Sequence, residues 1–185
     1  DIRADVYALG ATLYKLLSGR APFADEKYGH AGFTWGGGIE HQTCTSLLFW
    51  AFGEGLIAHE LAHSWSGNLV TNATWRDGWL NEGMTSYIEA RLMEVIYDVA
   101  RVDEERVLMY RELLLDLERV PEPMQALAPR LDDADPDGFQ GTVHYHKGRM
   151  FLEYLEKAFG RDAFDAFLNA YFDMVSAVTT TVCSG

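Results

Sequence analysis

The stretch HELAH at residues 59–63 constrains the fold of this chain more than any other feature. Its two histidines are spaced so that, on a helix, both imidazoles project from one face and can reach a single metal ion. Glu60 lies about 100° around the helix from His59, so its carboxylate can approach a bound water without having to ligate the metal. The motif therefore predicts a helix that carries two metal ligands, His59 and His63, and a general base, Glu60.

A third ligand is expected from a second helix, because a catalytic zinc site uses three protein ligands and keeps one position open. Glu82 lies in the stretch WLNEG at 79–83, at the start of the next predicted helix. An antiparallel pair of helices would bring it back toward the histidines, and a buried structural glutamate is the alternative. We expect one Zn²⁺ at this site. Glu89, two turns further along, is expected to be a solvated side chain rather than a support for the site.

Apolar residues at helical spacing predict a mainly α-helical chain of the α+β class. The helices are expected at residues 5–17, 55–65, 79–97, 102–120, 144–159 and 163–175. Residues 24–41 are rich in glycine and aromatic residues and predict an edge strand that another backbone can approach closely. The polar end around Thr179–Thr181 is expected to fray.

Composition excludes several classes of function. The chain has 185 residues, of which 48% are hydrophobic, enough for one domain with a real core. A formal net charge of −13 argues against a nucleic-acid partner. The longest mainly apolar stretch, 46–58, is interrupted by Glu54 and glycines, so no membrane span is expected.

Cys44 and Cys183 are expected to be free thiols. The compartment stays open between cytoplasm and periplasm, with cytoplasm favoured.

The longer stretch HELAHSWSGNLVTNATWRDGWLNEG at 59–83 resembles the gluzincin zinc metallo-aminopeptidases, especially the branch with aminopeptidase N and leukotriene hydrolase. The resemblance extends over about residues 22–181 and implies a thermolysin-like catalytic subdomain, helical with a glycine-rich edge strand. Enzymes of this family also have a β-rich N-terminal domain and a helical C-terminal domain. The resemblance thus implies that residues 24–185 are a partial catalytic domain and that both other domains are missing.

The stretch GGIEH at 37–41 resembles the family's G-G-M-E-N signature. This resemblance implies that Glu40 binds the free α-amino group of a peptide, since a carboxylate pairs with an ammonium. Gly37 and Gly38 would let the substrate backbone lie close to the strand, although an ordinary β-bulge is the alternative. The implied substrates are peptides with a free N-terminus.

The stretch YHKG at 145–148 resembles the family's Y-x-K-G. The resemblance implies that the Tyr145 hydroxyl stabilises the oxyanion that develops during cleavage. A core tyrosine at the start of a helix is the alternative. The implied activity is removal of N-terminal residues from peptides, with water activated by Glu60.

Residues 1–23 look foreign to this family. They resemble a helix from the large lobe of Ser/Thr protein kinases, with Asp5 and Gly10 matching that segment. The chain has no glycine-rich phosphate loop, H-R-D loop or D-F-G aspartate, so kinase activity is set aside. Two alternatives to an active peptidase stay open: a catalytically impaired zinc-binding fragment, and an interaction module that uses the helix at 5–17.

Overall fold

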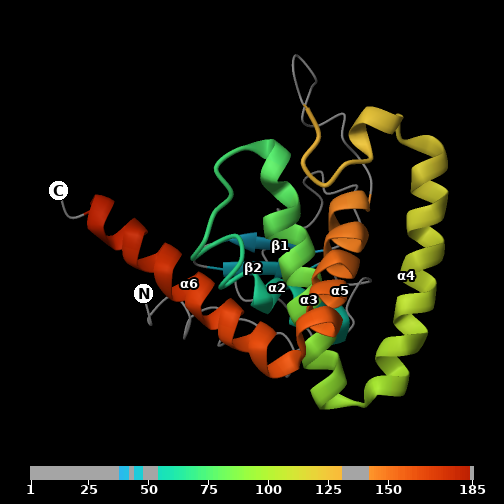
Figure 1. Ribbon diagram of the computed structural model, residues 1–185, viewed down its shortest axis with the longest axis horizontal. Helices are drawn as coiled ribbons and strands as arrows, with labels where there is room; N and C mark the ends of the chain where they lie inside the picture. The colour runs from blue at the N-terminus through green and yellow to red at the C-terminus, as the bar shows by residue number, and fades with distance from the viewer. Residues whose placement is uncertain (1–37, 42–43, 48–53, 131–141, 184–185) are drawn as a thin grey trace, which may run out of the picture.

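The computed structural model describes the backbone of residues 38–41, 44–47, 54–130 and 142–183 (Figure 1). The elements are β1 (Gly38–His41), β2 (Cys44–Leu47), α2 (Glu54–Ala62), α3 (Gly78–Ile96), α4 (Val99–Arg119), α5 (Gly148–Phe159) and α6 (Arg161–Cys183). Short helical turns are η2 (Trp75–Asp77), η3 (Glu122–Met124) and the π-helical η5 (Val143–Lys147). The helix expected at 5–17, the segment 1–23 and Gly37 lie outside the described residues.

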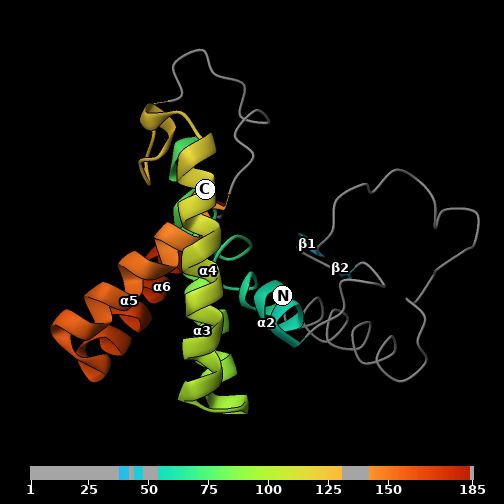
Figure 2. The same cartoon turned by 90° about the vertical axis from the view of Figure 1, so that its right-hand side faces the viewer.

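Helix α3 is the central element of the fold. It contacts α2, α4, α5 and η5, and α6 packs on α5. Figure 2 shows α5 and α6 on one side of the α3–α4 pair, and α2 with the two strands on the other. This arrangement is mainly helical, as the apolar periodicity predicts, and it places the motif-bearing α2 directly against α3.

Two apolar clusters hold α3 in place. Ala58 of α2 packs with Ala90 and Met93 of α3 and with Val102 of α4. On the other face, the second cluster consists of Met84, Tyr87, Leu152 and Phe164, from α3, α5 and α6. Since burial of each large side chain contributes about 1.5–3 kcal/mol, these two clusters fix α3 between its neighbours. Among the aromatic side chains of α5 and α6, Phe164 is buried, whereas Phe151, Tyr154 and Phe167 are exposed.

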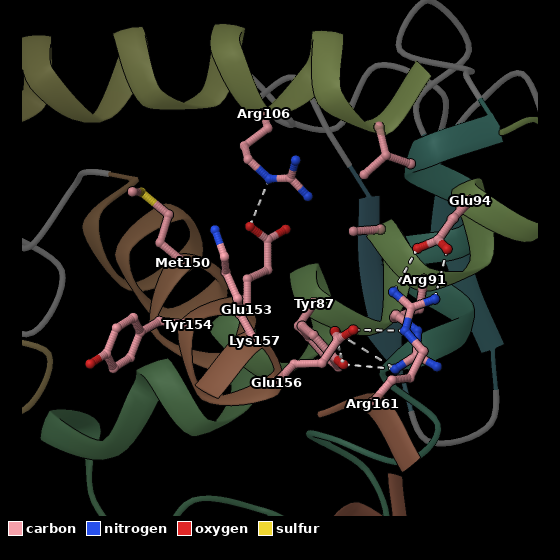
Figure 3. Close-up of a pocket in the computed structure, with 12 residues that line it drawn as sticks. Tyr87, Arg91, Glu94, Arg106, Met150, Glu153, Tyr154, Glu156, Lys157 and Arg161 are labelled. Carbon is pink, nitrogen blue, oxygen red and sulfur yellow. Dashed lines mark hydrogen bonds and ion pairs between the residues drawn. The ribbon is translucent and has the colours of Figure 1, made fainter. Parts of the chain in front are cut away.

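Paired charges surround a cavity of about 510 Å³ between α3, α4 and α5 (Figure 3). Arg161 binds both carboxylate oxygens of Glu94, at 2.7 and 2.9 Å. Arg106 donates to Glu153 at 2.9 Å. The cavity walls are thus held together by ion pairs between helices that are far apart in sequence.

The observed boundaries differ from the expected ones at several helices, and those of α2 and α6 differ at their C-terminal ends. Helix α2 ends at Ala62 rather than continuing to residue 65. Helix α6 continues to Cys183, so the prediction of a frayed end at Thr179–Thr181 is wrong for the backbone. No glycine or proline interrupts the sequence between Arg161 and Cys183, and the backbone therefore has no local signal to leave the helix.

The two strands form an antiparallel hairpin in which Glu40 pairs with Thr45. Both strands contact α2. The strand expected within 24–41 is therefore present as β1, and its partner β2 was not predicted. Among the described residues, no helix is both long and apolar enough to cross a membrane.

Candidate metal centre

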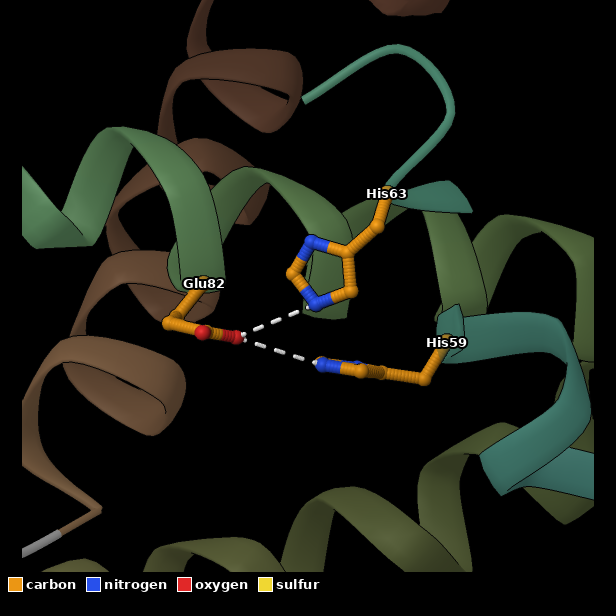
Figure 4. Close-up of side chains that lie close together, drawn as sticks. All are labelled: His59, His63 and Glu82. Atoms are coloured by element: carbon orange, nitrogen blue, oxygen red, sulfur yellow. Dashed lines mark hydrogen bonds and ion pairs between the residues drawn. The ribbon is translucent and has the colours of Figure 1, made fainter. Parts of the chain in front are cut away.

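Three side chains from α2, its C-terminal turn and α3 converge on one point (Figure 4). The Oε2 atom of Glu82 lies 3.3 Å from Nε2 of His59 and 3.4 Å from Nε2 of His63. With zinc–ligand bonds of ~2.0–2.1 Å, donors at the corners of a tetrahedron lie about 3.3–3.4 Å apart. Both distances from Glu82 therefore match the edges of a tetrahedral zinc site, and the three donor atoms all lie within 4.8 Å of one another.

The backbone explains why both histidines face the same way. His63 follows the last residue of α2, yet its N–H still donates to the carbonyl of His59 at 3.2 Å. The helical turn is thus completed at His63, and the two rings meet edge to face with centroids 4.8 Å apart. Glu82 lies in the second turn of α3 and reaches both rings from the facing helix.

The Nδ1 atoms of both histidines are surrounded by hydrogen-bond acceptors. Nδ1 of His63 lies 2.9 Å from the carbonyl of Ser66 and 3.0 Å from Oδ1 of Asn81. Nδ1 of His59 lies 3.0 Å from Oε2 of Glu89. Because a carboxylate or carbonyl oxygen only accepts, Nδ1 of each imidazole carries a hydrogen, and Nε2 is the atom that faces Glu82 and is left for a metal ion. The expectation that Glu89 is merely solvated is therefore wrong, because its carboxylate contacts a ring of the site.

Charge coupling within the cluster is strong. Burial lowers the pKa of His59, but hydrogen bonds to Glu82 and Glu89 outweigh it and raise that pKa to about 10. Burial raises the pKa of Glu82, but hydrogen bonds from His59 and His63 outweigh it and lower that pKa to about 2. Without metal the cluster is a buried ion pair, and a divalent cation that binds there replaces a proton.

The connection after α2 is built around Gly67. Its φ of 118° is a conformation that side chains other than glycine rarely adopt. A Cβ at this position would lie 2.6 Å from Oδ1 of Asn81 and 3.1 Å from Nδ1 of His63. Gly67 therefore allows the loop to press against the groups that orient His63.

A second glycine contact sets the distance between α3 and α5. A Cβ added to Gly83 would lie 2.7 Å from the Cα of Gly148 and 2.8 Å from the carbonyl oxygen of His144. The two backbones touch here, one residue after Glu82 and three residues after Tyr145. The close approach requires glycine on both helices and brings the Tyr145 segment next to the metal ligands.

Tyr145 lies on η5 beside the cluster. Its ring stacks on the ring of His59, with centroids 5.9 Å apart and planes inclined by 23°. A cavity of about 270 Å³ opens at this place and is lined by His59, Glu89 and Tyr145 among others. A ligand in this cavity could therefore contact Tyr145 and His59, whereas His63 and Glu82 are not among its lining residues.

For the remaining predicted site residues in the described part of the chain, the structure gives a position on an element. Glu60 is buried on α2, with 5% of its surface exposed. Glu40 and Gly38 lie on β1, which contacts α2, while Gly37 lies outside the described residues. The structure thus brings together His59, His63, Glu82 and Tyr145, and gives Glu40 a backbone position on the strand next to α2.

Comparison with known proteins identifies the family. The Peptidase family M1 domain matches residues 53–183. The chain belongs to this family.

Leucine aminopeptidase 2 of Ajellomyces capsulatus is 43% identical over 119 residues, which cover 63% of this chain and 19% of that protein. A leukotriene A-4 hydrolase homolog of Botryotinia fuckeliana is 40% identical over 119 residues, covering 63% of this chain and 18% of its own length. The chain therefore spans about a fifth of the length of the curated relatives it matches.

Solved M1 structures share the fold. Yeast LTA4 hydrolase in complex with bestatin superposes with a TM-score of 0.71 at 36% identity, covering 76% of this chain and 24% of that one. An M1 zinc metallopeptidase from Deinococcus radiodurans superposes with a TM-score of 0.63 at 26% identity, covering 76% of this chain and 29% of that one. The helical catalytic subdomain expected from the sequence is confirmed.

Sequence reasoning missed three residues that shape the site. Asn81 and Gly67 act on His63 together, and Gly148 forms the contact with α3. Each lies inside a motif that was noted for another residue. The sequence shows only that a glycine or an asparagine lies near a proposed site residue. It does not show which residue of another element that glycine or asparagine contacts.

Proposed function

We propose that this chain is the zinc-binding catalytic part of an aminopeptidase that removes N-terminal residues from peptides. The main support is the convergence of His59, His63 and Glu82, whose donor atoms all lie within 4.8 Å of one another. The names of the relatives, leucine aminopeptidase 2 and leukotriene A-4 hydrolase homolog, agree with this activity. A cytoplasmic location stays a prediction from the sequence.

His59, His63 and Glu82 would hold the zinc ion, which when bound supplies Lewis acidity to the reaction. The carboxylate of Glu60 then takes a proton from the attacking water and can return it to the leaving amine. Its place on α2, directly after His59, and its burial are consistent with this role.

Tyr145 and Glu40 would bind two different groups of the substrate, the carbonyl oxygen of the scissile peptide bond and the free α-amino group. The hydroxyl of Tyr145 donates a hydrogen bond to the oxygen that becomes negative, and stacking on His59 holds the tyrosine ring beside the metal face. The Glu40 carboxylate pairs with the free α-amino group, which limits cleavage to the first peptide bond. With Gly37 and Gly38, this edge of β1 would receive the substrate backbone.

The deciding experiment compares Glu60→Gln with the parental chain in zinc content and in hydrolysis of an aminoacyl anilide. The amide keeps the shape of the side chain but accepts no proton, so we expect zinc binding to persist and turnover to fall by a factor of about 10² or more. Glu118→Gln is the matched control, because Glu118 is an exposed glutamate on α4. Hydrolysis by Glu60→Gln at the parental rate would refute the assignment of the base.

A second candidate is a zinc-binding fragment without turnover. It is favoured by one observation, namely that the chain spans only about a fifth of its relatives. Other parts of a longer enzyme exclude water and position substrate, and chemistry suffers when those parts are lacking. One zinc per chain with no hydrolysis of the anilide by the parental protein would select this candidate.

A further inference from the structure

Glu89 has a position that the proposed reaction leaves unused. Its Oε2 atom lies 3.0 Å from Nδ1 of His59, across the interface between α3 and α2. Its Oε1 atom lies beside the first turn of α2, 3.1 Å from the place that a Cβ on Gly55 would take. The carboxylate therefore lies against α2 and is bound to it through Oε2, although Glu89 itself belongs to α3.

We propose that Glu89 is a positioning residue that orients His59 as a metal ligand and makes its Nε2 a stronger donor. The inference rests on the proposed zinc site. A carboxylate accepts the Nδ1 hydrogen, fixes the ring plane and the tautomer, and adds negative charge that makes Nε2 more basic. Glu89 thereby acts on the metal through His59 and does not itself contact the ion.

The two histidines differ in this respect. The acceptors around Nδ1 of His63 are neutral, namely the Ser66 carbonyl, Asn81 Oδ1 and Thr85 Oγ1, at 2.9, 3.0 and 3.1 Å. Within the described part of the chain, the Nδ1 contact of His59 is with a carboxylate. His59 is also the more exposed of the two, with 12% of its side-chain surface accessible against 2% for His63. His63 is held by packing from all sides, whereas the orientation of His59 depends on the charged hydrogen bond.

Two substitutions separate charge from hydrogen bonding. Glu89→Gln keeps an acceptor for Nδ1 and removes the negative charge, whereas Glu89→Ala removes both. We expect zinc affinity of the full 185-residue chain, measured by competition with a chelator, to fall about tenfold in Glu89→Gln and up to about 100-fold in Glu89→Ala. Glu94→Gln is the matched control, because Glu94 lies on the same helix and pairs with Arg161 away from the cluster.

A spectroscopic measurement distinguishes positioning from general stability. With Co²⁺ in place of Zn²⁺, the visible absorption bands report the ligand geometry, and we expect them to shift in Glu89→Ala and to be partly restored in Glu89→Gln. The thermal midpoint of the metal-free protein is expected to fall in both variants, because each removes the charge that pairs with His59, so the zinc affinity and the Co²⁺ bands decide the matter. An equal loss of midpoint in the metal-free variants, with unchanged zinc affinity, would overturn the inference and make Glu89 a structural residue.

The outcomes also separate this inference from the proposed function. Parental protein that binds no zinc would refute the proposed zinc site itself. Parental protein that binds zinc, together with Glu89→Ala that binds it equally well, would refute only the role of Glu89. Weaker binding in Glu89→Ala with parental binding in Glu94→Gln supports the role.

Discussion

The region around α2 and the helix α4 are stabilised in different ways. The nine residues of α2 and the turn that follows bury three polar side chains, those of Glu60, His63 and Ser66, beside the small apolar Ala58 and Ala62. The 21 residues of α4 bury only Val102, Met109 and Leu113 and leave most of the helix exposed. The site therefore depends on directional hydrogen bonds and backbone contacts, whereas α4 depends on a narrow apolar stripe.

Local interactions support α4 in addition to that stripe. The side chain of Asp98 caps the helix by accepting from the N–H of Arg101 at 2.9 Å, and Arg101 pairs with Glu105 at 3.0 Å. A cap contributes about 1 kcal/mol and an exposed pair less than that. Such interactions form independently of the neighbouring helices, so single changes on the exposed faces of α4 should be tolerated far better than changes near α2.

The largest effect is expected at the contact of α3 with α5. Gly83→Ala places a methyl group 2.7 Å from the Cα of Gly148, and backbone cannot move aside as a side chain can. We expect a loss of about 3 kcal/mol in the free energy of unfolding, measured by chemical denaturation, together with displacement of Tyr145. Gly78→Ala at the start of the same helix is the control, because no atom lies within 4 Å of its added Cβ. Equal stabilities of the two variants would contradict the close contact.

A change at Gly67 tests the loop that supports His63. Both Gly67→Ala and Gly160→Ala put alanine at a positive φ, 118° and 86° respectively, which costs about 1–3 kcal/mol. Only at Gly67 does the methyl group also strike Asn81, whereas the site at Gly160 is open. We therefore expect Gly67→Ala to weaken zinc binding measurably and Gly160→Ala to leave it unchanged. If both variants bound zinc like the parental chain, the loop would not orient His63.

The sequence predicts those features that depend on regular spacing within one helix. Helices followed from apolar spacing, and the pairing of His59 with His63 followed from one helical turn. Glu82 could be expected because a zinc site needs a third donor from another element. These inferences require only the geometry of one helix or the coordination chemistry of one ion.

The unpredicted part depends on how separate elements meet. The hydrogen bond of Glu89 with His59 joins residues 30 positions apart, and nothing in the sequence separates Glu89 from a solvated glutamate on a charged helix. The contact of Gly83 with Gly148 likewise exists only once α3 and α5 cross. Strand β2 has no alternating pattern long enough to reveal it. Roles of the proposed substrate residues, and the division at residue 23, stay predictions.

Acidification should have a smaller effect, at the ion pair between α3 and α6. The hydrogen bonds from Arg161 lower the pKa of Glu94 below its ordinary value. A carboxylate with a lowered pKa in the folded protein stabilises it above the unfolded pKa, and this stabilisation is lost as the pH falls through the folded one. We therefore expect the parental chain to lose up to about 1 kcal/mol more than Glu94→Gln as the pH falls from neutral to below about 4. Denaturation curves at several pH values measure this, and parallel profiles for both proteins would contradict it.

The smallest effect is expected on the exposed side of α4. Leu115 is 51% exposed, so Leu115→Gln removes little buried apolar surface and keeps good helix propensity. We expect a change within about 0.5 kcal/mol in the free energy of unfolding and no change in zinc affinity. Leu113→Ala is the internal contrast, because Leu113 is only 4% exposed and its truncation should cost about 2–5 kcal/mol. A large loss from Leu115→Gln would mean that this face of α4 is covered in solution, and the contrast between α4 and the α2 region would then need to be redrawn.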